Sequence, residues 1–158
     1  IFYCQKNTGR PFDANNKYTS KYMDMPNTPQ YPFGFGLSYT TFSYENLSAD
    51  KTTFGMNDKI TVSVTLKNTG TQDGEEVAQL YVRDLVGSLT RPLKELKGFQ
   101  KIFLKKGESK QLLFTITEND LRFYNNKLNY ISEPGKFKLF IGTNSSDVKE
   151  AEFALIKK

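Results

Sequence analysis

From Leu37 onward, the sequence consists of short segments in which apolar and polar residues alternate, separated by turn-forming residues at intervals of roughly ten positions. In the segment Ile60–Leu66, every second residue is Ile, Val or Leu, and Thr or Ser stands between them. Side chains two positions apart share one face of a β-strand, so this pattern predicts a strand with one buried face. The runs that we expect to form strands are Leu37–Leu47, Ile60–Leu66, Val77–Arg83, Phe99–Leu104, Gln111–Ile116, Lys136–Ile141 and Ala151–Ile156.

The number and length of these runs restrict the fold class. No long window shows a helical period, and no repeat of roughly 20 to 50 residues occurs. About seven short strands joined by turns predict an all-β protein, an antiparallel β-sandwich. The turn at Asn68–Gly70 suggests that Ile60–Leu66 and Val77–Arg83 are antiparallel neighbours. One helical turn is expected over Thr117–Leu121, because its first four residues have the form of a capping box.

Residues 1–36 differ from the rest of the chain. They contain four of the six prolines, asparagines typical of turns, and no sustained period. Such a stretch indicates an extended, irregular segment. We therefore divide the chain into an extended N-terminal segment, residues 1–36, and the sandwich, residues 37–158.

Charge and composition argue against several classes of partner. The 22 Lys and Arg are interleaved with 17 Asp and Glu, and no nucleic-acid recognition motif accompanies them. No apolar run approaches the roughly 18 residues that a membrane-spanning helix requires. The sequence has no histidine and one cysteine, Cys4, which excludes a Ser-His-Asp triad and a histidine metal site. We expect no cofactor, no metal, no nucleic-acid partner and no membrane insertion.

Carboxylates are the remaining candidates for catalysis. A glycosidase needs two of them roughly 5 to 10 Å apart, one with a raised pKa. Those of the strand region stand at turns and strand ends, where a sandwich places solvent-facing groups. We therefore expect solvated or structural roles, and no catalytic residue, among Asp73, Glu75, Glu76, Glu108, Glu118 and Asp120.

Aromatic side chains are concentrated in residues 31–44. The cluster is too dense for a simple sugar-stacking platform and contains no Trp, so we expect it to pack against a neighbouring domain, with sugar stacking as the alternative. Within it, Gly34–Gly36 lacks the third glycine, lysine and following helix of a phosphate-binding loop, which favours a closely packed backbone turn. The candidate docking residues are Tyr31, Phe33, Phe35, Tyr39 and Phe42.

The string YPFGFGLSYTTFSY, residues 31–44, resembles the signature with which family 3 glycoside hydrolases enter their C-terminal fibronectin type III-like domain, a sandwich of the immunoglobulin-like class. Upstream, Asn7–Pro11 and Lys17–Asp24 resemble the stretch that leaves the α/β-sandwich domain in the periplasmic bacterial β-glucosidase branch. Later blocks agree with the family in the same order, namely Lys67–Gly70, Gly74–Val82, Arg91–Phe99, Glu133–Phe137 and Ile141–Gly142.

This resemblance implies a division of labour within a larger parent chain. Residues 1–36 would be the tail of the preceding α/β-sandwich domain and a linker, and residues 37–158 the fibronectin type III-like domain. The family's catalytic aspartate and glutamate lie in polypeptide that precedes this sequence, so no catalytic residue can be carried over. The implied role is a non-catalytic module that stabilises or docks onto the parent's barrel and α/β domains.

The resemblance also implies the setting of the parent. That enzyme would hydrolyse terminal β-glucosyl units of an oligosaccharide or β-glucoside, in the periplasm or as a secreted protein. Two other hypotheses stay open. One is a stand-alone carbohydrate-binding or adhesion module. The other makes residues 9–25 a loop at the rim of an active site, with Arg10, Tyr18, Tyr22 and Asp24 as substrate-rim residues.

Overall fold

The computed structural model describes residues 13, 15–19, 24 and 28–157. Alternating residues form strands there, and turn residues end them. In chain order the elements are β1 (Phe42–Ala49), β2 (Thr53–Gly55), β3 (Lys59–Asn68), β4 (Gly74–Asp84), β5 (Glu95–Leu104), β6 (Ser109–Thr117), α1 (Glu118–Leu121), β7 (Phe123–Tyr124), β8 (Tyr130–Ile131), β9 (Gly135–Gly142) and β10 (Val148–Ile156).

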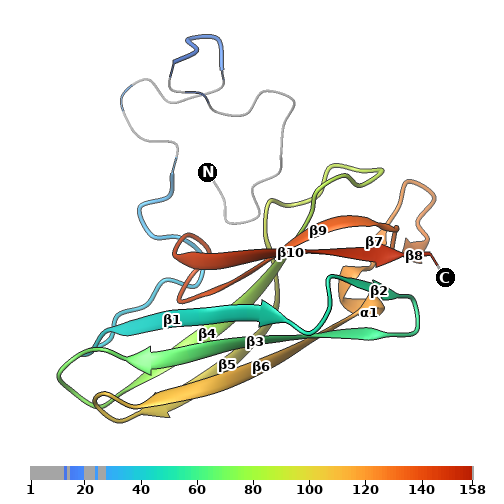
Figure 1. The fold of residues 1–158 in the computed structure, drawn as a ribbon. Helices are drawn as coiled ribbons and strands as arrows, with labels where there is room; N and C mark the ends of the chain where they lie inside the picture. Colours follow the sequence, from blue (N-terminus) through green and yellow to red (C-terminus); the bar gives the residue numbers. More distant parts are fainter. Residues whose placement is uncertain (1–12, 14, 20–23, 25–27, 158) are drawn as a thin grey trace.

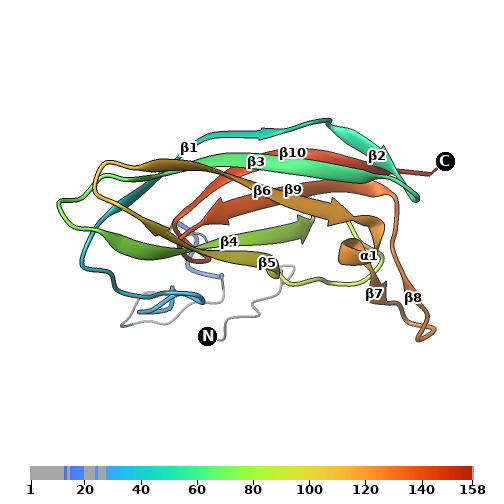
Figure 2. The same cartoon turned by 90° about the horizontal axis from the view of Figure 1, so that it is seen from below.

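The strands form two sheets that face each other (Figures 1 and 2). One sheet has the order β1-β3-β6 and the other the order β2-β10-β9-β4-β5, while β7 and β8 form a small hairpin of their own. Neighbouring strands are antiparallel except for β2 and β10, which run parallel. The β-sandwich expected from the alternating pattern is confirmed.

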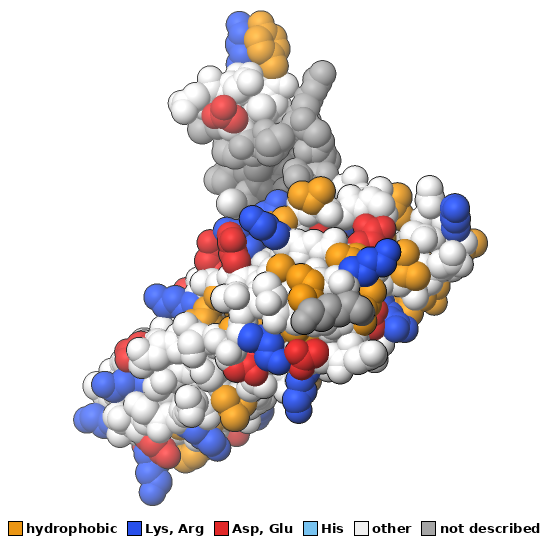
Figure 3. Space-filling model, turned by 45° about the vertical axis from the view of Figure 1, so that its right-hand side comes forward, with side chains coloured by type: hydrophobic (Ala, Val, Ile, Leu, Met, Phe, Trp, Pro, Cys, Tyr) orange, Lys and Arg blue, Asp and Glu red, His pale blue; other side chains and the backbone are white. Residues whose placement is uncertain are grey.

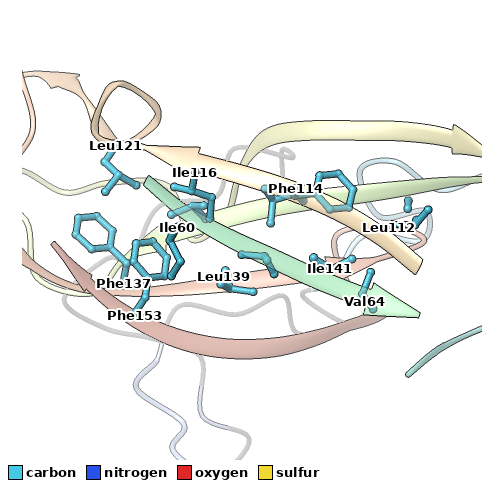
Figure 4. Close-up of a cluster of buried hydrophobic side chains, with 14 of the residues drawn as sticks. Ile60, Val64, Leu112, Phe114, Ile116, Leu121, Phe137, Leu139, Ile141 and Phe153 are labelled. Carbon is cyan, nitrogen blue, oxygen red and sulfur yellow. The ribbon is translucent and has the colours of Figure 1, made fainter. Parts of the chain in front are cut away.

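The core lies between the two sheets and is built from the inward residue of each alternating pair. Ile60, Val62 and Val64 of β3 are fully buried. Figure 4 shows such side chains from both sheets converging on one layer. In the same layer, the rings of Phe137 and Phe153 stack with their centroids 5.4 Å apart. Each such side chain stabilises the fold by about 1.5–3 kcal/mol relative to exposure.

The segment between β3 and β4 crosses from one sheet to the other. β3 pairs with β1 and β6, whereas β4 pairs with β5 and β9. The expectation that Ile60–Leu66 and Val77–Arg83 are antiparallel neighbours is therefore wrong. Both strands direct apolar side chains into the core. Alternation shows that a strand has one buried face, but it does not show in which sheet the strand lies, because strands of opposite sheets bury the same kind of face.

A buried asparagine holds this crossing in place. Asn68, the last residue of β3, is fully buried. Its Oδ1 accepts hydrogen bonds from Thr40 Oγ1 at 2.7 Å and from the amide of Gly70 at 3.1 Å. Its Nδ2 donates to the carbonyl oxygens of Gln72 at 2.8 Å and Leu104 at 3.1 Å. One side chain thereby joins the segment before β1, the crossing itself and the end of β5.

The helical turn expected from the capping box is confirmed as α1. Asp120 Oδ2 accepts hydrogen bonds from the backbone amide and the hydroxyl of Thr117, each at 2.7 Å. Leu121 of this turn is buried, and the chain returns to an extended conformation at Arg122. The strands that the sequence did not predict are β2, β7 and β8. Each has only two or three residues, which is too short for alternation to show.

Candidate domain-docking site

The stretch of residues 33–34 lies against the outer face of the five-stranded sheet. Gln79 and Tyr81 of β4 point outward, since their neighbours in the strand fill the core. Gln79 Nε2 donates to the carbonyl oxygens of Gly34 at 3.0 Å and Thr143 at 2.6 Å. The Tyr81 hydroxyl donates to Gln79 Oε1 at 2.6 Å. These bonds attach the N-terminal segment to both β4 and the β9–β10 turn.

Phe33 completes this attachment. Its ring meets the ring of Tyr81 edge-on, with centroids 6.3 Å apart and an interplanar angle of 79°. Its carbonyl oxygen accepts a hydrogen bond from the amide of Ser145 at 2.9 Å. Tyr81 is consequently buried although it faces outward, and this burial raises its pKa to about 12. The hydroxyl therefore remains protonated at neutral pH and keeps its role as a donor.

Lys94 reinforces the same corner from the loop between β4 and β5. Its Nζ donates to the carbonyl oxygen of Ser145 and lies 4.6 Å from the centroid of the Phe140 ring. Burial lowers the pKa of Lys94. Nearby, the Arg91 guanidinium binds Glu95 at 2.7 Å. The charged residues of the block Arg91–Phe99 thus have roles inside the module.

Gly34 allows this close approach. Its φ of +80° lies in the left-handed region that glycine adopts without strain. A Cβ at this position would lie 2.0 Å from Gln79 Oε1, well inside contact distance. The closely packed turn expected at Gly34–Gly36 is therefore confirmed at Gly34, whereas Gly36 is exposed and a Cβ there would meet no atom within 4 Å.

Replacing Gly34 by alanine should release the N-terminal segment from β4. A positive φ costs a non-glycine residue about 1–2 kcal/mol, and the collision with Gln79 adds to it, so the amide hydrogen of Ser145 should exchange roughly tenfold faster or more. Gly36→Ala is the matched control, because its Cβ would meet no atom within 4 Å. Exchange at Ser145 that is equally slow in the wild type and in Gly34→Ala would contradict this account.

The five candidate docking residues divide into two groups. Tyr39 is 100% exposed, and Tyr31, Phe33 and Phe35 also present ring surface to solvent, with Tyr31 and Phe35 5.1 Å apart. Phe42 instead belongs to β1 and packs against the sandwich core. Tyr31, Phe35 and Tyr39 therefore present surface that another domain could contact, whereas Phe33 already packs against Tyr81 and Phe42 chiefly stabilises the sandwich.

A hollow of about 580 Å³ is lined by the segment of residues 34–42 and by β4. Its lining combines apolar side chains with carboxylates, namely Phe35, Leu37, Phe42, Val77, Glu75, Glu76 and Asp147. Glu75 forms an ion pair with Lys101 at 2.6 Å, and Glu76 accepts a hydrogen bond from the Tyr44 hydroxyl at 2.8 Å. Two of the three carboxylates are thus already engaged, which does not fit the paired acid and base of a glycosidase.

Two carboxylates expected at the surface are buried instead. Glu76 and Glu118 are each 8% exposed, so the expectation of solvent-facing positions is wrong for this pair. Burial and the contact with Glu76 raise the pKa of Tyr44 far above its usual value, which keeps its hydroxyl a donor. Glu118 binds the Arg122 guanidinium at 2.9 Å, and this bond lowers the pKa of Glu118. Both carboxylates have structural roles, supplied by partners that sequence position alone does not reveal.

The structure describes two of the four proposed substrate-rim residues. Arg10 and Tyr22 lie outside the described residues. Tyr18 and Asp24 are exposed, and Lys17 Nζ lies 5.2 Å from the centroid of the Tyr18 ring. Among the residues that the structure describes, no group of three or more acidic or cysteine side chains is placed to hold a metal ion. The rim hypothesis therefore stays a prediction.

The outer faces of the two sheets differ in chemistry. On the three-stranded sheet, β3 directs three hydroxylated side chains outward between two terminal lysines, namely Thr61, Ser63 and Thr65, and Ser63 Oγ lies 2.8 Å from Ser48 Oγ. On the five-stranded sheet, β4 and β5 expose four apolar side chains next to the attached segment, which we call the β4–β5 stripe: Val77, Leu96, Phe99 and Phe103. The alternating pattern of the sequence does not indicate this stripe. The only available signal was that Phe99 and Phe103 fall on the face opposite Leu104.

The charged side chains follow the mixed pattern expected from the sequence. Figure 3 shows Lys and Arg interleaved with Asp and Glu over the face that it displays. Several are ion pairs across neighbouring strands, such as Lys138 with Glu150 at 2.8 Å. No helix among the described residues is both long and apolar enough to cross a membrane.

A family model described as the fibronectin type III-like domain matches residues 76–145, which run from β4 to the β9–β10 turn. The match lies within the sandwich and agrees with its fibronectin type III-like fold. Its relatives include the periplasmic β-glucosidase of Salmonella typhimurium, 46% identical over 158 residues that cover 99% of this chain and 21% of that protein. Thermostable β-glucosidase B of Acetivibrio thermocellus is 46% identical over 121 residues, which are 76% of this chain and 16% of that protein.

Solved structures agree with these relatives. A β-glucosidase from Listeria innocua, crystallised with glucose, superposes with a TM-score of 0.91 at 40% identity over 98% of this chain and 22% of that protein. A family 3 β-glucosidase from Bifidobacterium adolescentis gives a TM-score of 0.73 at 37% identity over 79% of this chain and 18% of that protein. The chain thus spans about a fifth of the length of the relatives that it matches.

Proposed function

We propose that this fibronectin type III-like domain is the non-catalytic C-terminal module of a β-glucosidase of glycoside hydrolase family 3. The observation that carries the proposal is its match, along almost the whole chain, to only about a fifth of each β-glucosidase. The parent would hydrolyse terminal β-glucosyl units with an aspartate and a glutamate that lie outside this chain. The periplasmic relative in Salmonella supports a periplasmic or secreted location.

The physical role that we assign to the module is support of the catalytic domains. Residues 1–36 would be the tail of the preceding α/β domain and a linker, and residues 37–158 the module. The attachment of Phe33 and Gly34 to β4 supports this division, because it fixes the linker's direction of approach to the sandwich. A fixed linker reduces the entropy lost when the module and its neighbour associate.

The experiment compares three proteins: the parent enzyme, the parent without residues 37–158, and the 158-residue chain. We expect the truncated parent to lose soluble yield and to unfold at a lower temperature, and the 158-residue chain to release no glucose from a β-glucoside. A truncated parent as stable and active as the whole would contradict the support role. Turnover by the 158-residue chain would contradict its non-catalytic assignment.

The stand-alone binding module is tested on the same material. Titration of the 158-residue chain with cello- and laminari-oligosaccharides should give no saturable signal. Saturable binding that survives in the parent, together with a dispensable module, would favour the carbohydrate-binding alternative.

A further inference from the structure

We propose that the β4–β5 stripe is the surface through which this module contacts the catalytic part of its own parent chain, which presents an uncharged apolar patch to it. This inference rests on the proposed function and specifies its contact surface. The stripe consists of Val77, Leu96, Phe99 and Phe103 on the outer face of the five-stranded sheet.

The two aromatic members are unusually open for a strand. Phe99 is 66% exposed and Phe103 56% exposed, although both lie within the ten-residue strand β5. Moreover, β5 is an edge of its sheet, with β4 as its one partner there. An exposed edge strand that also carries large apolar side chains favours aggregation unless another surface covers it.

The two lysines beside the stripe are already paired with carboxylates of the module. Lys101, between Phe99 and Phe103, pairs with Glu75 at 2.6 Å, and Lys97 pairs with Glu95 at 2.9 Å. The two lysines beside the stripe therefore already have carboxylate partners, and its apolar side chains are what it offers to a partner. An apolar, uncharged protein surface suits it better than a nucleic acid, an acidic peptide or a sugar that needs free hydrogen-bonding groups.

The position of the N-terminal segment indicates which partner covers the stripe. Phe99 stands opposite Gln79 in the β4–β5 register, and Leu96 stands opposite Tyr81. Gln79 and Tyr81 are the residues that hold Gly34 and Phe33, so the stripe continues directly from the attached linker. In the parent, the domain that precedes this linker is thereby tethered near the stripe at a high effective concentration. A second copy of the chain or a free glucan has no such tether.

Hydroxyl-radical footprinting tests this assignment without any substitution. The side chains of Phe99 and Phe103 should be oxidised several-fold more slowly in the parent enzyme than in the 158-residue chain. Leu113 is the internal control, because it is 57% exposed, as open as Phe103, but lies on the three-stranded sheet. Its oxidation rate should be the same in both proteins. Equal oxidation of Phe99 and Phe103 in both proteins would overturn the inference.

Footprinting would also distinguish other partners that could cover the β4–β5 stripe. Protection that appears in the 158-residue chain alone and grows with its concentration would identify a second copy, and protection by added cello- or laminari-oligosaccharides would identify a glucan. Either result overturns the assignment. If the module stabilises an active parent but Phe99 and Phe103 are oxidised there as fast as in the 158-residue chain, the proposed function stands and this contact surface is wrong.

Substitutions provide an independent readout. The double variant F99K/F103K should leave the stability of the 158-residue chain within about 0.5 kcal/mol, because both side chains are exposed there. In the parent, the same change should lower the unfolding temperature and increase proteolysis at the linker. L113K should change neither protein. A parent that tolerates F99K/F103K as well as L113K would also overturn the inference.

Discussion

Replacement of Asn68 by alanine should lower the free energy of unfolding of this domain by about 3 kcal/mol. The change removes four hydrogen bonds from a fully buried site and leaves the Thr40 hydroxyl and the Leu104 carbonyl without these partners. Each buried polar group left unsatisfied costs about 1–3 kcal/mol. For a domain of this size the unfolding temperature should fall by roughly 6–12 °C, which calorimetry measures directly.

Asn57→Ala serves as the control for the same chemical change at an exposed position. It should alter stability by less than about 0.5 kcal/mol. A similar small effect for Asn68→Ala would mean that the crossing between β3 and β4 is held by backbone contacts alone. The role assigned to the buried amide would then be wrong.

Gly142→Ala should be comparably destabilising, by about 3 kcal/mol, for a steric reason. A Cβ at this position would lie 1.9 Å from the carbonyl oxygen of Asp147 and 2.8 Å from Cα of Val148. Both are backbone atoms of the strand turn that pairs β9 with β10, so neither can move without opening that pairing. Urea unfolding of the variant should show a lower midpoint with an unchanged slope.

Gly135 offers a control in the same strand. A Cβ there would meet no atom within 4 Å, so Gly135→Ala should be neutral within about 0.5 kcal/mol. Equal stability of the two alanine variants would contradict the proposed close approach of β9 to β10. A loss confined to Gly142→Ala would confirm it.

The elements of this fold were predictable because burial requires alternation. Ile60–Leu66 shows every second side chain apolar, and this is the face that the core accepts. The capping box at Thr117 was visible because its two hydrogen-bonding residues are three positions apart in sequence. Local signals of this kind depend only on neighbouring residues.

The assignment of strands to sheets and the docking surface were not predictable in this way. The turn sequence at Asn68 is compatible both with a strand that folds back beside β3 and with one that crosses to the other sheet. The hydrogen bond that holds the crossing joins Asn68 to Leu104, 36 positions away. Tyr81 has the spacing of an outward residue, and only the arrival of Phe33, 48 positions earlier, buries it. Contacts between segments distant in sequence determine both features, and local sequence patterns do not indicate such contacts.

The place of β10 in its sheet has a consequence for how this domain is made. β10 follows all other strands in chain order, yet it lies between β2 and β9 and contributes Phe153 to the core. During synthesis, the earlier strands therefore form an incomplete sheet that exposes apolar core residues until β10 has left the ribosome. Synthesis rate and chaperone access during this interval should govern the yield of soluble protein more strongly than the final stability does.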